Sequence, residues 1–364
     1  MSSQLPDIHR PRLTQPARRA LSSLAALAKS AAWRALHPAT RGGYLQAARP
    51  APLTRVYYTA PDGWQAPVFY LPPAPGGAGE PVLLAHALGV GCDGFRYGTG
   101  STLAGTLARK GFAVYLLGHR GDRSAIAPSR DALAQATFDE ILGRDLPSAA
   151  AAVCAHSGFP RVHFAGHGLG GLLGMSWAAQ CPDNLASVVA IGSPIRFQRV
   201  PTELRRTARA LSLLPAHWEI PTRALARLAA PLLDDSASGG ARTRGVLEFA
   251  SEDLPVGLLR QLMRWQDQGS PTTADGLYDY SESLSSADVP LLTFAGSEDA
   301  VADPDNARPL WGHRDVAHRV AEGLGHLDLL LSEEAAKAIF EPVAVWIHAR
   351  RRLAWERDCE LRAS

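Results

Sequence analysis

Cysteine is scarce in this sequence of 364 residues, which contains four: Cys92, Cys154, Cys181 and Cys359. No two of them show the Cys-x-x-Cys spacing of zinc and redox sites, and they are too scattered to suggest a disulfide framework. Cys154 and Cys181 lie in apolar stretches, so we expect both to be core residues. The cysteine pattern fits a reducing compartment, and we predict a cytoplasmic protein.

Long apolar segments and a strong net charge are also missing. No run of about 18 apolar residues occurs, so we predict no transmembrane helix. A net charge of +2 does not suggest nucleic-acid binding.

The charge is uneven, because residues 1–52 hold eight Arg or Lys against the single acid Asp7. Residues 16–37 within this basic leader are predicted to form an amphipathic helix. We interpret the leader as a helix packed on the domain or as a loose arm. The alternatives are an organelle transit peptide and a membrane-surface anchor, which would give peripheral membrane contact.

Strand patterns alternate with helical patterns from residue 53 onward. The predicted strands are 54–59, 66–71, 81–86, 112–118, 161–166, 185–191, 289–296 and 316–321. The predicted helices are 100–110, 138–156, 169–180, 303–311 and 332–355. This alternation predicts an α/β fold with a mostly parallel central sheet flanked by helices, and the first two strands form an antiparallel edge hairpin.

The alternation stops between residues 194 and 288, which read as an inserted helical cap. We therefore divide the chain into the leader, a core of residues 53–193 and 289–355, the cap at 194–288, and a tail at 356–364. The cap interleaves arginines with leucines. This pattern favours amphipathic helices with solvated arginines, which would cover an apolar pocket. The alternative is that the arginines form an entrance for anionic head groups or a lipid surface.

A glycine-rich turn joins the strand at 161–166 to the helix at 169–180. It reads Gly166-His167-Gly168-Leu169-Gly170. Gly166 and Gly170 bracket a turn that is too sharp for side chains at those positions. The context of strand, sharp turn and helix is that of a nucleophile elbow.

Three other motifs follow predicted strands. His86-Ala87-Leu88-Gly89 follows the buried strand at 81–86. Gly296-Ser297-Glu298-Asp299 follows the strand at 289–296, and Gly323-Leu324-Gly325-His326-Leu327-Asp328 follows the last strand. An elbow, then an acid, then a histidine is the chain order of a hydrolase triad on this type of fold.

These motifs resemble the α/β-hydrolase superfamily, in particular lipase- and esterase-like members such as the acid and gastric lipases. The resemblance implies that His326 and Asp299 are the catalytic pair, with Glu298 as the competing acid. It also implies that backbone N–H groups of Leu88, or of Ala87, and of Leu169 form an oxyanion hole. The segment 112–124 resembles the family's Asp-x-Arg-Gly-x-Gly-x-Ser loop, but His119 and Asp122 depart from that pattern.

Gly168 stands where the family carries its nucleophilic serine, so the nucleophile position is vacant. His167, Cys92 and Ser193 are candidate substitutes, but none lies at the tip of the elbow. We therefore expect no protein nucleophile.

Three functions remain open. The first is an enzyme acting on an apolar ester or other carbonyl substrate, with His326 and Asp299 as a general-base pair; lyase or acyl-transfer chemistry is a variant of it. The second is a pseudo-hydrolase that binds an apolar ligand or a partner under its cap. The third is an inactivated variant of a serine ester hydrolase or lipase.

No cofactor is predicted, because the sequence has neither a phosphate loop nor a dinucleotide fingerprint. The histidines outside the motifs form no ligand-spaced cluster, so no metal site is predicted. The expected partner is a small apolar or acyl-type compound, and no nucleic acid is expected.

Overall fold

The computed structural model describes residues 53–87, 89–96, 101–197, 202–220, 250 and 252–350. The predicted leader and tail, Leu88 and the middle of the predicted cap lie outside the described residues. Among the described helices, none is long and apolar enough to cross a membrane.

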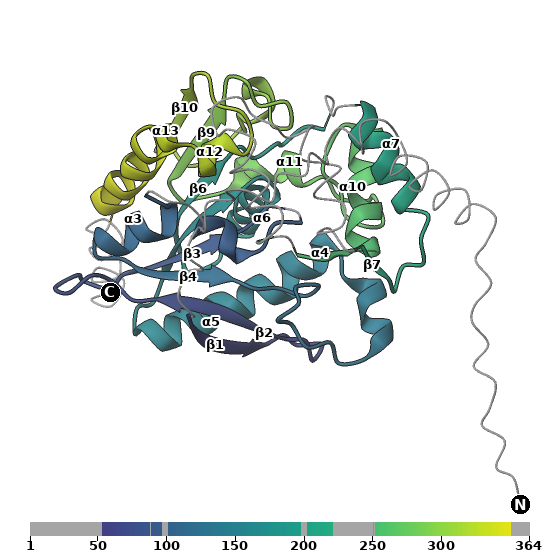
Figure 1. Ribbon diagram of the computed structural model, residues 1–364, viewed down its shortest axis with the longest axis horizontal. Coiled ribbons are helices and arrows are strands. Elements are labelled where there is room, and N and C mark those ends of the chain that lie inside the picture. Colours follow the sequence, from purple (N-terminus) through teal and green to yellow (C-terminus); the bar gives the residue numbers. More distant parts are fainter. Residues whose placement is uncertain are drawn as a thin grey trace, which may run out of the picture.

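A central sheet of eight strands organises the core (Figure 1). Its strands are β1 (Thr54–Thr59), β2 (Gln65–Leu71), β3 (Pro81–Ala85), β4 (Ala113–Leu117), β5 (Val162–His167), β6 (Leu185–Ile191), β9 (Leu291–Gly296) and β10 (Val316–Ala321). Their order across the sheet is β1-β2-β4-β3-β5-β6-β9-β10. The pairs β1–β2 and β2–β4 are antiparallel and all the others are parallel. The predicted fold class is confirmed, including the antiparallel edge hairpin.

Helices cover both faces of the sheet, and each face has its own core. Leu83 belongs to the core that also holds residues of α5 (Leu146–Ser157) and α6 (Leu169–Ala178). Its neighbours Val82 and Leu84 belong to the opposite core, with residues of α3 (Leu103–Arg109) and of the helical segment 336–347. Successive side chains of a strand point to opposite faces, so a continuous apolar strand such as β3 must be covered on both sides.

The shorter elements complete the core. The turns of 3-10 helix are η1 (Cys92–Phe95), η2 (Arg130–Gln135), η5 (Leu284–Ser286) and η6 (Pro304–Asn306). The remaining core helices are α4 (Phe138–Glu140), α12 (Asp328–Leu331) and α13 (Glu333–Ala335), and π-helical turns occur at η3 (Ile141–Asp145) and η7 (Ala336–Phe340).

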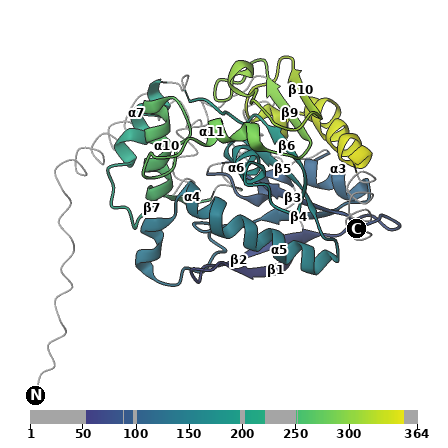
Figure 2. The same cartoon turned by 180° about the vertical axis from the view of Figure 1, so that it is seen from behind.

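The described part of the insertion between β6 and β9 is mainly helical. It contains α7 (Thr202–Leu211), β7 (Glu219–Ile220), β8 (Leu254–Pro255), α10 (Val256–Gln268) and α11 (Tyr280–Ser283). Both views place α7 and α10 side by side at one end of the molecule (Figures 1 and 2). The insertion contacts the core near the expected site, because the Glu252 N–H donates to the Gly89 carbonyl.

Two local expectations are wrong. The helix expected at 303–311 is only the short turn η6, because Pro309 lacks the N–H that would continue a helix. Cys181 is exposed rather than buried. It follows the last turn of α6 with a positive φ of 52°, which turns the chain toward the surface.

Candidate active site

The turn after β5 brings the chain sharply back into α6 and depends on glycine at two positions, Gly166 and Gly170. A Cβ on Gly166 would lie 2.3 Å from backbone atoms of Gly170, and one on Gly170 would lie 2.2 Å from the Ala85 carbonyl oxygen. Gly168, at the tip, has φ 55° and ψ −121°, which L side chains rarely adopt. The elbow geometry is therefore present around a residue without a side chain.

His326 lies directly beside this tip. A Cβ built on Gly168 would be 3.4 Å from His326 Nε2 and 3.2 Å from the Cβ of Ala87. The turn that carries His326 is fixed by Asp328, whose carboxylate accepts the Gly325 N–H at 3.1 Å. Hence the Gly-His-x-Asp spacing of the sequence has a local structural cause, and it aims the imidazole at the elbow.

Asp299 binds the other side of the same imidazole. Its Oδ2 lies 2.9 Å from His326 Nδ1, and its Oδ1 accepts the N–H groups of Val301 and Ala302 at 2.8 and 2.7 Å. Burial by itself would raise the pKa of Asp299, but His326 and the two backbone donors hold that pKa below its ordinary value. Glu298, the competing acid, is exposed. Asp299 is thus an ionised acceptor that orients His326 with Nε2 toward Gly168.

Gly192, just after β6, packs against this His326–Asp299 pair, and we expect Gly192→Ala to damage it. The new Cβ would lie 3.2 Å from Asp299 Oδ2, 3.3 Å from His326 Nδ1 and 2.9 Å from Leu329 Cδ1, at a φ of +54°. The expected loss is about 1–3 kcal/mol of folding free energy, accompanied by a shifted His326 ring resonance in the NMR spectrum.

The matched control is Gly158→Ala, which has φ +75° but no atom within 4 Å of its new Cβ. It measures the backbone penalty alone. Equal losses of unfolding free energy in the two variants, together with an unmoved His326 resonance, would contradict the proposed contact.

The oxyanion hole is only partly within the described residues. Leu169 begins α6, where first-turn N–H groups have no partner inside the helix and point outward. Leu88 lies outside the described residues, so the second donor stays a prediction. The Ala87 methyl group lies 3.2 Å from the position that a Cβ on Gly168 would occupy.

None of the three candidate substitute nucleophiles is placed for attack. His167 is buried, and its Nε2–H donates to the His326 carbonyl at 3.0 Å; burial, followed by the charge of His326, lowers its pKa to about 3. Burial raises the pKa of the Cys92 thiol well above its usual range, so the thiolate is disfavoured. Ser193 is buried, and its hydroxyl donates to the Ile191 carbonyl beside Gly171.

A narrow pocket opens beside the elbow, between the core and the insertion. Leu169 and Gly170 line it at the elbow, and Leu254 and Leu258 line it from the insertion. The rest of its wall is Ala85, His86, Ala87, Gly89, His119, Asp122, Phe138, Ile141, Leu173, Glu252, Asp253 and Pro255. The wall is thus mostly apolar, with polar groups gathered on one side.

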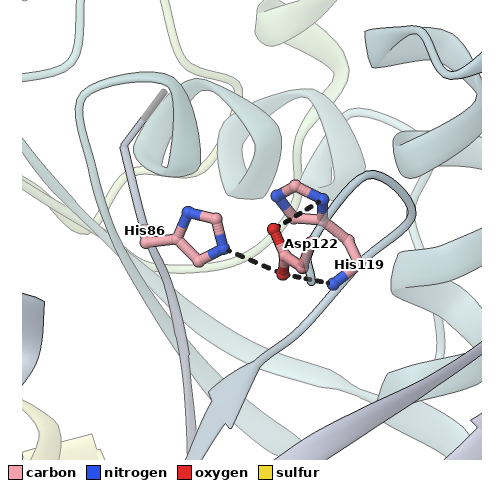
Figure 3. Close-up of side chains that lie close together, drawn as sticks. All are labelled: His86, His119 and Asp122. Carbon is pink, nitrogen blue, oxygen red and sulfur yellow. Dashed lines mark hydrogen bonds and ion pairs between the residues drawn. The ribbon is translucent and has the colours of Figure 1, made fainter. Parts of the chain in front are cut away.

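Three polar residues of this lining, His86, His119 and Asp122, form a cluster that the sequence analysis did not predict. His86 follows β3, whereas His119 and Asp122 follow β4, and the ends of these paired parallel strands are adjacent. His86 Nε2 lies 3.3 Å from Asp122 Oδ2, and the two imidazole rings stack at 4.6 Å (Figure 3). Burial would lower the pKa of His86, but the Asp122 carboxylate outweighs it and raises that pKa. The only signal in the sequence was that His119 and Asp122 depart from the family pattern.

A Ser-His-Glu arrangement outside the candidate site lies at the opposite end of the strands. His163 is 2.7 Å from the Ser187 hydroxyl and 3.1 Å from Glu80 Oε1. His163 and Ser187 are fully buried, so no substrate reaches them. We interpret this group as a satisfied polar contact within the sheet.

Residues 80–333 match the family model of the alpha/beta hydrolase fold. A comparison with curated protein sequences finds no match.

Solved structures resemble this chain at low sequence identity. A thermophilic esterase from Thermogutta terrifontis matches with a TM-score of 0.55 at 18% identity, covering 82% of this chain and 99% of its own. A Paleococcus ferrophilus monoacylglycerol lipase gives 0.56 at 18% identity, with 78% and 99% covered. The enol-lactonase from Burkholderia xenovorans LB400 gives 0.55 at 18% identity, with 80% and 99% covered. At this level of identity, the likeness concerns the fold.

Proposed function

This chain belongs to the alpha/beta hydrolase fold family, and from that membership we propose that it acts on the carbonyl group of a small apolar ester or acyl compound. His326 serves as the general base in this proposal, Asp299 orients it, and no side chain acts as nucleophile. The observation that carries the proposal is the 3.4 Å between His326 Nε2 and the Cβ position of residue 168. A water hydrogen-bonded to Nε2 would therefore lie close to where other family members carry the serine hydroxyl.

The reaction proposed is direct hydrolysis by that water. His326 Nε2 removes a proton from the water while its oxygen attacks the carbonyl carbon, which gives a tetrahedral oxyanion. The Leu169 N–H at the start of α6 and a donor from the loop after β3 stabilise this oxyanion. The imidazolium then returns the proton to the departing alkoxide, and the acid and the alcohol leave.

The lining of the pocket supports an apolar substrate. Phe138, Ile141, Leu173 and Leu258 form one wall beside Leu169. Such a wall binds an acyl or alkyl group through buried apolar area, at roughly 25 cal/mol per Å². The hydrolytic names of the structural neighbours agree with this substrate class.

His326→Ala and Asp299→Asn test the proposal on a panel of p-nitrophenyl esters and lactones of increasing acyl length. Loss of a general base costs about 10²–10⁴ in rate, so we expect kcat to fall by that range in His326→Ala and to fall clearly in Asp299→Asn. Glu298→Gln is the matched control, because this exposed neighbour does not contact the imidazole. Unchanged kcat in both test variants would refute the general-base role.

Gly168 itself favours a second candidate function, which is binding without turnover. The methyl of Ala87 lies 3.2 Å from the Cβ position of residue 168, so the tip has no reactive side chain and little room for one. Isothermal titration with medium-chain fatty acids and their esters distinguishes the two functions. Tight binding together with no turnover of any ester would support the binding protein over the enzyme.

Peripheral membrane contact stays a separate proposal. The leader that suggested it lies outside the described residues. In α7 of the insertion, Arg205 and Arg209 both bind Asp267 of α10, at 3.3 and 2.5 Å. This pairing supports the interpretation of these two arginines as a solvated helix face rather than as an entrance for anions.

A further inference from the structure

The cluster of His86, His119 and Asp122 has the composition and spacing of a metal site. One ligand atom from each residue lies within 4.8 Å of the other two. Ligands of a tetrahedral zinc ion, each about 2.0–2.2 Å from the metal, are separated by roughly 3.4 Å. A small inward movement of the three side chains is therefore enough to surround an ion.

The hydrogen bonds of the two imidazoles prepare them for coordination. His86 Nδ1 faces the Ala87 carbonyl at 3.0 Å, and His119 Nδ1 faces the Arg120 carbonyl at 2.8 Å. A carbonyl only accepts, so each Nδ1 carries a proton and Nε2 is the ring nitrogen left to bind a metal. At His86 the ion would take the place of the hydrogen that Nε2 shares with Asp122 Oδ2 at 3.3 Å, and binding would release that proton. Metal-binding histidines show this arrangement, because the outer hydrogen bond fixes both the tautomer and the ring.

A hydrogen bond also fixes the Asp122 carboxylate, because the backbone N–H of His119 donates to Asp122 Oδ2 at 2.9 Å. Its distances to the imidazoles, 3.3 Å to His86 Nε2 and 3.7 Å to His119 Nδ1, exceed the roughly 2.7–2.9 Å of a charge-assisted hydrogen bond. The three groups therefore face one another without closing into tight ion pairs (Figure 3).

The surroundings favour a bound cation with one open coordination position. The side chains of His86 and Asp122 are 4% and 7% exposed, which limits competition from water. Glu252 and Asp253 add negative charge to the same pocket, and Arg123 pairs with both of them. The apolar wall that includes Leu169 borders the remaining side.

We propose that His86, His119 and Asp122 bind one divalent transition-metal ion, for which zinc is the best match. Two histidines and one carboxylate with an open position form a common catalytic zinc set, whereas magnesium and calcium prefer oxygen ligands. The ion would lie in the pocket that also contains the start of α6. The site does not depend on His326 acting as a base.

The full chain, stripped with a chelator and dialysed, tests the site by zinc titration calorimetry and by metal analysis after a second dialysis. We expect one zinc ion per chain, and affinity lower by at least about 100-fold in His119→Ala and Asp122→Asn. His217→Ala is the matched control, since this histidine is exposed on the insertion. Cobalt substitution adds a visible absorption band that should disappear in both test variants.

The outcome is separable from the proposed hydrolysis. Circular dichroism melts test whether His119→Ala folds. If that variant does not fold, Asp122→Asn still tests the site, because asparagine has nearly the same shape as aspartate. His326→Ala should bind zinc like the unmodified chain. No bound zinc, or equal affinity in all variants, would overturn the metal site and would show that the cluster is only a hydrogen-bonded group, whatever the ester assays show.

Discussion

Gly168→Ser is expected to make this chain a serine hydrolase that a fluorophosphonate probe labels. The new Cβ would lie 3.4 Å from His326 Nε2, so a hydroxyl one bond further can hydrogen-bond to that nitrogen. The Asp299–His326 pair already stands at 2.9 Å. A complete triad contributes about 10⁶ to kcat, whereas the oxyanion hole and substrate binding without a triad give about 10³–10⁴ over the uncatalysed reaction. We therefore expect the rate of p-nitrophenyl ester hydrolysis to rise by at least about 10²-fold.

Ala87 modulates this result. Its Cβ would lie 3.2 Å from the Cβ of the introduced serine, which is tighter than an ordinary contact. Ala87→Gly together with Gly168→Ser should therefore be faster than Gly168→Ser alone.

Two variants control for the added side chain. Gly168→Ala adds the Cβ without the hydroxyl and should show no labelling, and Gly168→Ser with His326→Ala should lose it again. If neither serine variant is labelled, His326 is not aligned with the elbow tip and the general-base proposal loses its geometric support.

Arg120→Ala is expected to cause the largest loss of stability in the molecule. This side chain is fully buried and binds Asp145, also fully buried, at 2.7 Å, and Asp62 at 2.8 Å. The Arg120 N–H donates to Asp145 as well, at 2.9 Å. Removing one partner of a buried ion pair leaves the other charge without compensation, which costs about 3–5 kcal/mol. Urea unfolding followed by tryptophan fluorescence measures the difference.

Arg144→Ala is the matched control, because Arg144 binds Asp62 and Glu140 in the same group but is 43% exposed. An exposed pair contributes about 0–1 kcal/mol. A loss below about 1 kcal/mol in Arg120→Ala would contradict the proposed role of the buried pair. Arg120 also lies between His119 and Asp122, so the variant should weaken zinc binding along with stability.

Local patterns in the sequence were sufficient to predict the fold. Continuous apolar runs such as those of β3 and β6 must be covered on both faces, and alternation with helices requires parallel crossovers. Glycines 166 and 170 indicated the sharp elbow for a reason that the structure shows directly, since a Cβ at either would overlap backbone atoms. The apolar spacing at 303–311 does not produce a helix, because Pro309 lacks the N–H that a helix would use there.

The site was predictable in its order along the chain but not in its distances. His326 and Asp299 follow strands that parallel pairing places at one edge, so sequence order alone suggested their meeting. The sequence contained no information on the contact between Ala87 and Gly168, or on Gly192 against the pair. Those contacts depend on how five separate loops, one after each of β3, β5, β6, β9 and β10, approach one another.

The sequence by itself determined the α/β-hydrolase fold and the glycine at the tip of the elbow, because both follow from residues close together in the chain. Only the tertiary structure decided that His86, His119 and Asp122 form one group. Their strands lie side by side in the sheet, yet the two histidines are 33 positions apart in the chain, and nothing local indicates that the side chains face the same pocket. The tertiary structure also distinguished two histidine–carboxylate pairs by their surroundings, since His326 with Asp299 borders the elbow, whereas His163 with Glu80 is sealed within the sheet.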